Sequence, residues 1–421
     1  APLVHGDVFA DSQHLREVEA ACLLIIPEVA DFHQVPRLCH HAAAVVVRGE
    51  RADLELLAGA VHDFVTLWAS VREDGQTLPK IARTTIGPVS GLTASIATMF
   101  IIVCTLASVA LIVVKALAHS PWGMFTILVT IPAALLTGLW MYKLRPGKVG
   151  EASVIGVSIV MAGVFLGQPF AASSYGHSLV FSEMSLKIML PVYAAIASIL
   201  PVWVLMCPRD YLSSYMKIGV IAVLAVGLVV AHPSLKMPAT TPFIHGGGPI
   251  IPGSVWPFVC IVIMCGAISG FHALIASGTT PKMIYKESDI RPIGYGAMVL
   301  EGFVAMTALI AACALAPGDY FAINLDPDKA PAFVQQSARE HNLDFRPVEL
   351  STLEEETGEK LAGRSGGAVT LAVGMAKVFS NLPGMRTLMS YWYHFVIMFE
   401  ALFILTLLET GTRVARFVFQ E

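Results

Sequence analysis

The sequence predicts an all-α, polytopic membrane helix bundle. Hydrophobic residues make up 55% of the 421 residues and charged residues only 14%, whereas an ordinary soluble domain carries about 25% charged residues. The mean hydropathy is +0.69, and apolar runs of about 20 residues, the length that crosses a hydrocarbon core, recur along the chain. A soluble enzyme is therefore excluded. The formal net charge of -4 and the lack of a long basic tract give no reason to expect a nucleic-acid partner.

The first 55 residues form a segment unlike the rest of the chain. They are rich in charged residues, and their only apolar run, Ala20–Ile26, is too short to span a membrane. His33, His40 and His41 are candidate metal ligands, but no carboxylate or cysteine is placed to complete a site. We therefore expect residues 1–55 to be a polar segment, non-native or disordered, followed by a transmembrane domain over residues 56–421.

Apolar segments of membrane-spanning length recur from residue 92 onward, separated by polar or Gly- and Pro-containing connectors. The predicted spans are Leu92–Val114, Trp122–Tyr142, Ala152–Gln168, Leu186–Met206, Ile218–Ala231, Val255–Ala276, Gly294–Ala316 and Tyr391–Leu408. Before them, the apolar run Leu56–Val71 leads into a polar connector, Arg72–Gly87. A shorter segment, Gly367–Phe379, cannot cross the membrane straight and is predicted to be re-entrant or amphipathic.

Basic residues alternate between the connectors of these spans. Four alternate connectors are rich in them: Arg72, Lys80 and Arg83, then Lys143, Arg145 and Lys148, then Arg209 and Lys217, then Lys282, Lys286 and Arg291. The connectors between them hold few basic residues. The positive-inside rule places the basic connectors in the cytoplasm, so residues 317–366 are predicted to be an extracytoplasmic loop.

The stretch of residues 266–291 combines features of a membrane helix that borders a polar cavity. Gly266 and Gly270 lie four residues apart on one helix face, where the missing side chains let another backbone approach closely. Pro281 is predicted to end or break the helix, because its ring disfavours helical geometry at the residue before it. A single histidine, His272, lies five residues before the Ser-Gly-Thr-Thr-Pro sequence at this break.

Free carbonyls and hydroxyls at a helix break can hold a cation, so Ser277, Thr279 and Thr280 are candidate ligands for an ion or a substrate. A lone histidine on an apolar helix is more often a satisfied core residue than a ligand. The position of His272 close to the break makes a binding role equally plausible.

Charged side chains inside apolar segments are further candidates, since each costs roughly 2.5–3.5 kcal/mol to insert into a membrane helix. Asp63 is predicted to bind a coupling proton or cation, with His62 tuning it; the alternative is a carboxylate that caps a helix end. Glu301 is predicted to be a proton-coupling carboxylate, and the alternative is a buried ion pair.

Two more polar residues in predicted spans are weaker candidates for a substrate site. Gln168, followed by Pro169, ends a span and faces either a substrate or a loop. Glu400 lies near the middle of the last span, nine residues before Glu409 and so on a different face.

Two further sets of charges are predicted to be structural. Arg209 and Asp210 are read as a local pair at a helix start. Glu409 and Arg413 are read as a surface pair four residues apart on a helix.

No motif for a catalytic centre, a metal site or a cofactor is apparent. The sequence has no C-x-x-C, G-x-S-x-G or H-E-x-x-H. We therefore expect neither an enzyme nor a bound metal or cofactor, and only a coupling ion, H⁺ or Na⁺.

Several of these stretches together resemble one family, the carbon starvation protein (CstA-like) transporters. The matching pieces, which extend from about Leu57 to Gln420, are GAVHDF, IGPVSG, CPRDYLSSYMKIG, SGFHALIASGTTPKMI, EGFVAM, PGDYFAIN, NLPGM and MSYWYHFVIMFEALFILTLLETGTRVARF. The resemblance implies a bacterial inner-membrane secondary transporter, linked to peptide uptake or to pyruvate/proton symport. It also implies a relation to the amino acid–polyamine–organocation superfamily, with inverted repeats and broken helices.

The chain departs from that family in two respects. Residues 1–55 do not resemble its apolar, glycine-rich N-terminal helices, and family members are longer at both ends, so we expect a fragment or a frame-shifted N-terminal stretch. Glu409 stands where the family is expected to have aspartate.

The sequence thus predicts a secondary active transporter that imports small peptides or pyruvate across the inner membrane during carbon starvation, coupled to protons. The expected partners are that substrate and the lipid bilayer. The alternatives are a channel, or a membrane-embedded enzyme or sensor without coupled transport.

Overall fold

The computed structural model describes residues 58–201, 204–238, 241–250, 268–341, 345–382 and 384–420, with isolated positions between 252 and 266. Throughout these residues the regular structure is helical and no strand occurs, which confirms the all-α prediction. The predicted polar segment, residues 1–55, lies outside the described residues. Ten of the 22 residues of the predicted span Val255–Ala276 also lie outside them.

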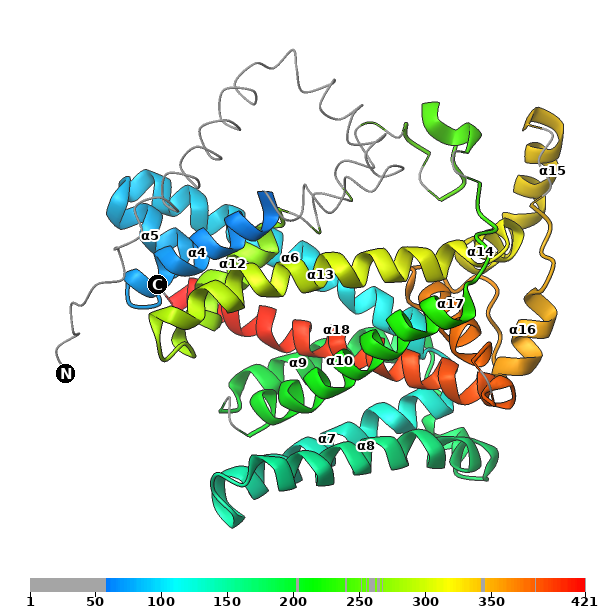
Figure 1. Cartoon of the computed structure of the whole chain (residues 1–421). Helices are drawn as coiled ribbons and strands as arrows, with labels where there is room; N and C mark the ends of the chain where they lie inside the picture. The colour runs from blue at the N-terminus through cyan, green and yellow to red at the C-terminus, as the bar shows by residue number, and fades with distance from the viewer. Residues whose placement is uncertain are drawn as a thin grey trace.

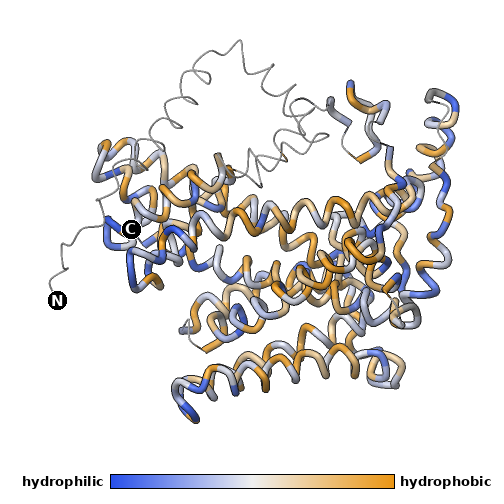
Figure 2. Tube along the Cα trace, viewed as in Figure 1, coloured by the Kyte–Doolittle hydropathy of each residue, from blue (hydrophilic) through white to orange (hydrophobic). Residues whose placement is uncertain are grey.

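Six helices among the described residues are long and apolar enough to cross a membrane, and each of them contains or overlaps a predicted span. Figure 2 shows that apolar residues dominate the long helices and that hydrophilic residues gather toward the ends of the bundle. These segments are α6 (Pro88–Leu117), α7 (Pro121–Leu139, continued by the π-helical turn Trp140–Leu144), α8 (Val149–Ala172), α10 (Met206–Ala231), α13 (Ile290–Cys313, preceded by the turn Glu287–Asp289) and α18 (Met389–Gln420).

The predicted span Leu186–Met206 is wrong as one continuous helix. Helix α9 (Glu183–Ile199) stops before Pro201, and Leu200 has extended backbone geometry, as expected for a residue that precedes proline. Helix α10 then begins at Met206, twelve residues before the predicted start at Ile218. Proline is tolerated in the first turn of a helix, so Pro208 does not prevent this early start.

Helix α18 lies at the centre of the bundle, where it packs against α6, α9, α10 and α17. Figure 1 shows it crossing the middle of the molecule, with its C-terminal end near α4 and α12 and its first residues near α16. Tyr393, Val396, Met398 and Ala401 on this helix are fully buried. Helices α7 and α8 pack together as a hairpin along one side.

The short apolar segment predicted over Gly367–Phe379 is helix α17 (Ala368–Ser380). Its buried residues lie on every face, so the amphipathic alternative is wrong. Gly374 accounts for the tight packing, because a Cβ atom there would meet the carbonyl oxygen of Ala311 on α13 at 2.6 Å.

Helices α4 (Ala60–Arg72), α5 (Leu78–Thr85) and α12 (Gly270–Gly278) gather near the C-terminus (Figure 1). The predicted connector Arg72–Gly87 therefore contains a helix. Helix α12 stops at Gly278, and the 3₁₀ turn Thr280–Lys282 follows, which confirms the predicted end at the Ser-Gly-Thr-Thr-Pro sequence.

Among the described residues, no backbone approaches the predicted positions Gly266 and Gly270 closely. A Cβ atom would meet no described atom within 4 Å at Gly266, and only the Ile101 side chain at Gly270. The close approach is at Gly294 instead, where a Cβ atom would lie 2.9 Å from the Cα of Phe64. Gly294 therefore lets α13 pack directly on α4.

The polar segment after α13 is folded against the ends of the long helices. It contains α14 (Pro317–Asn324), α15 (Ala330–His341) and α16 (Leu350–Thr357). The buried carboxylate of Asp319 accepts hydrogen bonds from the backbone N–H groups of Val348 (2.8 Å) and Glu349 (3.0 Å), which fixes the start of α16. Shorter 3₁₀ turns are Gly176–Leu179, Pro242–His245 and Arg386–Leu388.

Candidate functional site

Four of the predicted site residues meet where α4, α12 and α13 pack together. The Nδ1 atom of His62 lies 2.9 Å from Oδ1 of Asp63. The other carboxylate oxygen of Asp63 lies 3.3 Å from Nδ1 of His272, and Nε2 of His272 lies 3.7 Å from Oε2 of Glu301. We call these four residues the carboxylate–histidine chain.

Local sequence features position the members of this chain. Ser269 caps α12 by accepting a hydrogen bond from the backbone N–H of Phe271 at 3.1 Å, so His272 lies in the first turn of the helix. A helix N-terminus favours nearby negative charge, and Asp63 lies beside it. Because Gly294 packs directly against Phe64, α13 lies close to α4, and Glu301 on α13 lies near the residues of α4.

Within the carboxylate–histidine chain, side-chain exposure increases from Asp63 through His272 to Glu301. The Asp63 side chain is 13% exposed, His272 is 23% exposed and Glu301 is 49% exposed. An imidazole between two carboxylates can accept a proton on one nitrogen and donate one from the other. Chains of Asp, Glu and His inside membrane proteins are used as proton relays. The geometry therefore suits a proton path from Glu301 toward the more buried Asp63.

The hydroxyl residues at the end of α12 lie apart from this chain. Ser277 is buried; its hydroxyl donates to the carbonyl of Ala273 (2.8 Å), and its own carbonyl accepts from Ser70 of α4 (3.4 Å). Thr279 is buried and Thr280 half-buried. Among the described residues, no hydrogen bond or ion pair joins these three side chains to Asp63, His272 or Glu301.

The end of α12 lies against the last turns of α18. A Cβ atom on Gly278 would meet Val414 at 2.7 Å, and the Lys282 ammonium lies 3.7 Å from the ring centroid of Phe417. Glu400 is half-buried near the middle of α18. The structure thus brings four predicted residues together and leaves Ser277, Thr279, Thr280 and Glu400 elsewhere.

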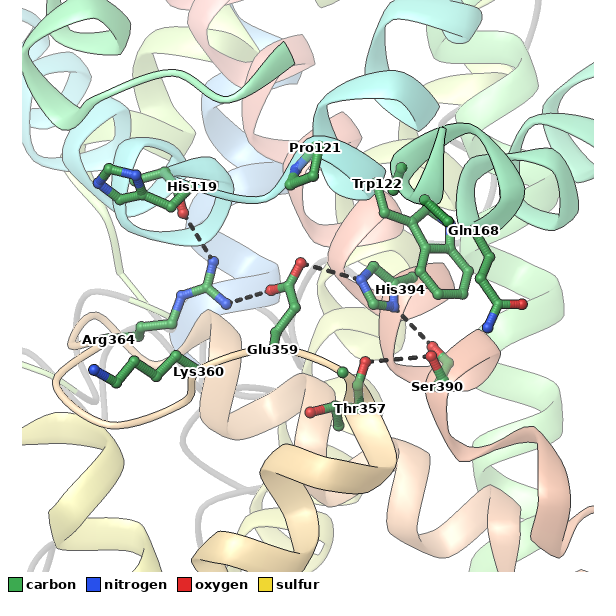
Figure 3. Close-up of a pocket in the computed structure, with 14 residues that line it drawn as sticks. His119, Pro121, Trp122, Gln168, Thr357, Glu359, Lys360, Arg364, Ser390 and His394 are labelled. Carbon is green, nitrogen blue, oxygen red and sulfur yellow. Dashed lines mark hydrogen bonds and ion pairs between the residues drawn. The ribbon is translucent and has the colours of Figure 1, made fainter. Parts of the chain in front are cut away.

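Gln168, another of the predicted site residues, lines a cavity. The cavity has a volume of about 390 Å³ and lies between the start of α7, the end of α8, the start of α18 and the loop after α16. Figure 3 shows Glu359 projecting between His394 on one side and Arg364 on the other. Gln168 accepts a hydrogen bond from the Tyr391 hydroxyl.

Glu359 is the centre of a buried network in this cavity. One carboxylate oxygen accepts from the Ser120 hydroxyl and lies 3.1 Å from Nε2 of His394, and the other accepts from the Arg364 guanidinium. Burial by itself would raise the pKa of Glu359. The hydrogen bond and charge of His394, the charge of Arg364 and the Ser120 hydroxyl outweigh burial and lower that pKa to about 2.

Arg364 also ties the loop to the end of α6. Its Nη2 donates to the carbonyls of Ala116 (2.9 Å) and Ala118 (3.4 Å), and its Nε donates to that of Lys115 (3.3 Å). The last carbonyls of a helix have no partner within the helix, so one side chain both neutralises Glu359 and caps α6.

A second buried ion pair lies near the other end of the bundle. Arg209 on α10 pairs with Glu409 on α18, each side chain is 1% exposed, and the Tyr193 hydroxyl contacts both. The predicted local pair of Arg209 with Asp210 is therefore wrong. So is the predicted surface pair of Glu409 with Arg413, because Arg413 donates to the carbonyls of Ala197 and Leu200.

A family model described as carbon starvation protein CstA matches residues 55–421. The chain belongs to this family. The peptide transporter CstA of Bacillus subtilis (strain 168) is 48% identical over 366 residues, 87% of this chain and 59% of that protein. The pyruvate/proton symporter BtsT of Escherichia coli (strain K12) is 45% identical over 393 residues, 87% of this chain and 55% of that protein.

This CstA-family chain spans about half the length of the curated relatives it matches. The peptide transporter CstA of Campylobacter jejuni is 47% identical over 372 residues, 87% of this chain and 53% of that protein. No solved structure matches, so the relation to the amino acid–polyamine–organocation superfamily stays a prediction. Family membership and six helices able to span a membrane make this a multi-pass protein of the cell inner membrane.

The residues of the Glu359 network were not found from sequence. Glu359 and Arg364 lie in a polar segment that also holds Glu354, Glu355 and Lys360, and a dense charge run is typical of a solvated surface. One sequence feature could have pointed to this network: His394 is a titratable residue in the aromatic run YWYHF that opens the last span.

Proposed function

We propose that this protein is a secondary active transporter that imports small peptides or pyruvate across the inner membrane, coupled to protons. The observation that carries the proposal is the carboxylate–histidine chain, where His272 lies between Asp63 and Glu301. Among the relatives, one is named a pyruvate/proton symporter and others are named peptide transporters. A titratable chain between apolar helices is what proton coupling requires.

In this proposal Glu301 takes up the coupling proton and His272 passes it to Asp63, which His62 holds in place. Gln168, Ser277, Thr279, Thr280 and Glu400 remain candidate contacts for the substrate or the ion. The protein acts without a bound cofactor and is a carrier, neither enzyme nor channel. The segment 317–366 faces the extracytoplasmic side, as the distribution of basic residues predicts, and residues 56–421 form the transport domain.

The test is uptake into proteoliposomes that contain the 421-residue chain. Labelled pyruvate and labelled dialanine are supplied in turn, with an imposed pH gradient, with the gradient collapsed, and with external sodium replaced by choline. We expect accumulation that requires the pH gradient and persists without sodium.

Glu301→Gln should abolish gradient-driven uptake, because the amide cannot take up a proton, while the helical content stays unchanged. Glu151→Gln is the matched control, since Glu151 pairs with Arg145 on the surface and lies outside the carboxylate–histidine chain. Coupled uptake at the wild-type rate in Glu301→Gln would refute the proposed mechanism. Uptake that persists equally without a gradient would instead indicate a channel.

A further inference from the structure

The cavity around Glu359 lies apart from the carboxylate–histidine chain and has no part in the proton path. Three of its walls come from segments predicted to lie outside the membrane or at its outer surface: the α6–α7 connection, the end of α8 and the loop after α16. We propose that this cavity is an outer binding site for a small molecule that carries a carboxylate. The proposal does not depend on proton coupling through Asp63.

The first argument is charge. Glu359 is the one acidic side chain among the described lining residues, and Arg364 neutralises it within the network. The lining also includes Lys360, an exposed residue that forms no ion pair with any described residue. The cavity therefore keeps an unmatched positive charge, which favours an anionic ligand.

The second argument is the backbone at His119. This residue connects α6 to α7 with a φ of 59°, a left-handed geometry that is costly for a residue with a Cβ atom. His119 is one of the residues that line the cavity, and its ring makes no hydrogen bond within the described part of the chain, whereas its backbone N–H donates to the carbonyl of Phe181 at 3.1 Å. Backbone strain of this kind is concentrated at functional sites. A histidine held at this position supplies an N–H donor beside Lys360 and Arg364.

The third argument is the opposite wall. Figure 3 shows His119, Arg364 and Lys360 on one side of the cavity, and Trp122, His394 and Gln168 on the other. The Trp122 and His394 rings stack with centroids 3.7 Å apart at 11°, and the indole N–H donates to the Val164 carbonyl at 3.0 Å. This wall therefore presents stacked ring faces, and the indole is held in place by its own hydrogen bond.

Gly167 makes the position of Trp122 possible, because a Cβ atom there would lie 2.1 Å from Cδ1 of the indole. Beside this wall, Gln168 uses its oxygen for Tyr391, and its amide nitrogen has no partner among the described residues. One side of the cavity thus carries positively charged side chains. The opposite side carries a flat ring surface and the amide donor of Gln168. Its volume of about 390 Å³ falls within the roughly 300–1,000 Å³ of small-molecule sites.

The ligand class that fits is a carboxylate with a short neutral body. Pyruvate and the C-terminal half of a short peptide share this chemistry. The test is equilibrium dialysis of labelled pyruvate and of labelled dialanine against the purified 421-residue chain in lipid nanodiscs. Unlabelled dialanine amide, which lacks the carboxylate, serves as a competitor.

We expect at least one of the two labelled compounds to bind, and which one binds identifies the source of the carboxylate. Lys360→Gln should weaken binding about tenfold, the loss of one charge-assisted hydrogen bond. Lys329→Gln is the matched control, an exposed lysine of the same segment that does not line the cavity, and should bind as wild type. Dialanine amide should compete at least tenfold more weakly than dialanine.

Two further variants separate this site from the proton path and from a loss of folding. Asp63→Asn should bind the ligand as wild type even where its coupled uptake is lost. His119→Gly should weaken binding while its thermal unfolding temperature stays equal or rises, because glycine relieves the left-handed strain. Unchanged binding in Lys360→Gln, or no binding of either compound to the wild type, would overturn the proposal.

Discussion

The carboxylate–histidine chain and the Glu359 network both pair an imidazole with a carboxylate, but a different group is shared in each. In the chain, one imidazole, that of His272, is shared by two carboxylates at 3.3 Å and 3.7 Å. In the network, one carboxylate, Glu359, receives the Ser120 hydroxyl, the His394 ring and the Arg364 guanidinium.

The difference teaches which site is able to change its protonation. A carboxylate surrounded by donors is held in its charged form, since losing that charge would leave the donors unpaired. An imidazole between two acids has more than one place for a proton, at distances that a small movement closes. The Glu359 network is therefore suited to hold the fold, and the carboxylate–histidine chain to change state during the transport cycle that we propose.

Removing the Glu359 charge is the strongest way to test this contrast. Glu359→Gln leaves the Arg364 guanidinium buried without its counter-charge, and breaking a buried pair costs about 3–5 kcal/mol. We expect a loss of that size in the free energy of unfolding, measured by denaturant titration in detergent and followed by circular dichroism. Glu355→Gln, on the exposed face of α16, is the control and should change it by less than about 0.5 kcal/mol.

The same network should make the fold sensitive to acid. The pKa of Glu359 is lowered to about 2 from an ordinary value of 4.5. The charged carboxylate therefore stabilises the fold fully above about pH 4.5, and this stabilisation, about 3 kcal/mol, is lost as the pH falls toward about 2. The measurement is the unfolding free energy between about pH 5 and about pH 2. An identical acid profile in Glu359→Gln would show that another group is responsible.

The His272→Gln variant should show that the carboxylate–histidine chain differs in function from the Glu359 network. The amide cannot relay a proton, and a positioned acid–base group contributes roughly 100-fold or more to a rate. We expect coupled uptake to fall by about 100-fold, or about 2.7 kcal/mol, with little change in unfolding. His177→Gln, in an exposed turn, is the control. A large loss of stability with intact uptake would reverse the roles assigned to the two regions.

The smallest change in the free energy of unfolding is expected at a surface ion pair that belongs neither to the carboxylate–histidine chain nor to the Glu359 network. Lys115 and Glu183 lie 2.8 Å apart, and both side chains are more than one third exposed. Exposed pairs contribute about 0.2–1 kcal/mol, so Glu183→Gln should lower the unfolding free energy by less than about 1 kcal/mol, and less at high salt. A larger loss would mean that solvent does not screen this pair.

The sequence by itself determined the class of the protein and most of its long helices. Apolar runs must be long enough to cross the hydrocarbon core, so the predicted spans Leu92–Val114, Trp122–Tyr142 and Tyr391–Leu408 all lie inside observed helices. The cost of a charge in an apolar helix also identified Asp63, His272 and Glu301 individually. That signal is local, because it depends on the few residues to either side.

Only the tertiary structure decided which charges meet. Asp63 and His272 are 209 positions apart in the sequence and Arg209 and Glu409 are 200 apart, and no periodicity encodes such a pairing. Glu359 stands in a charge-rich segment, and burial arises only when that segment folds onto α6, α7 and α18. Desolvation and hydrogen bonding depend on neighbours in space. The same charged residue can therefore be solvated or fully enclosed, and its local sequence does not distinguish the two.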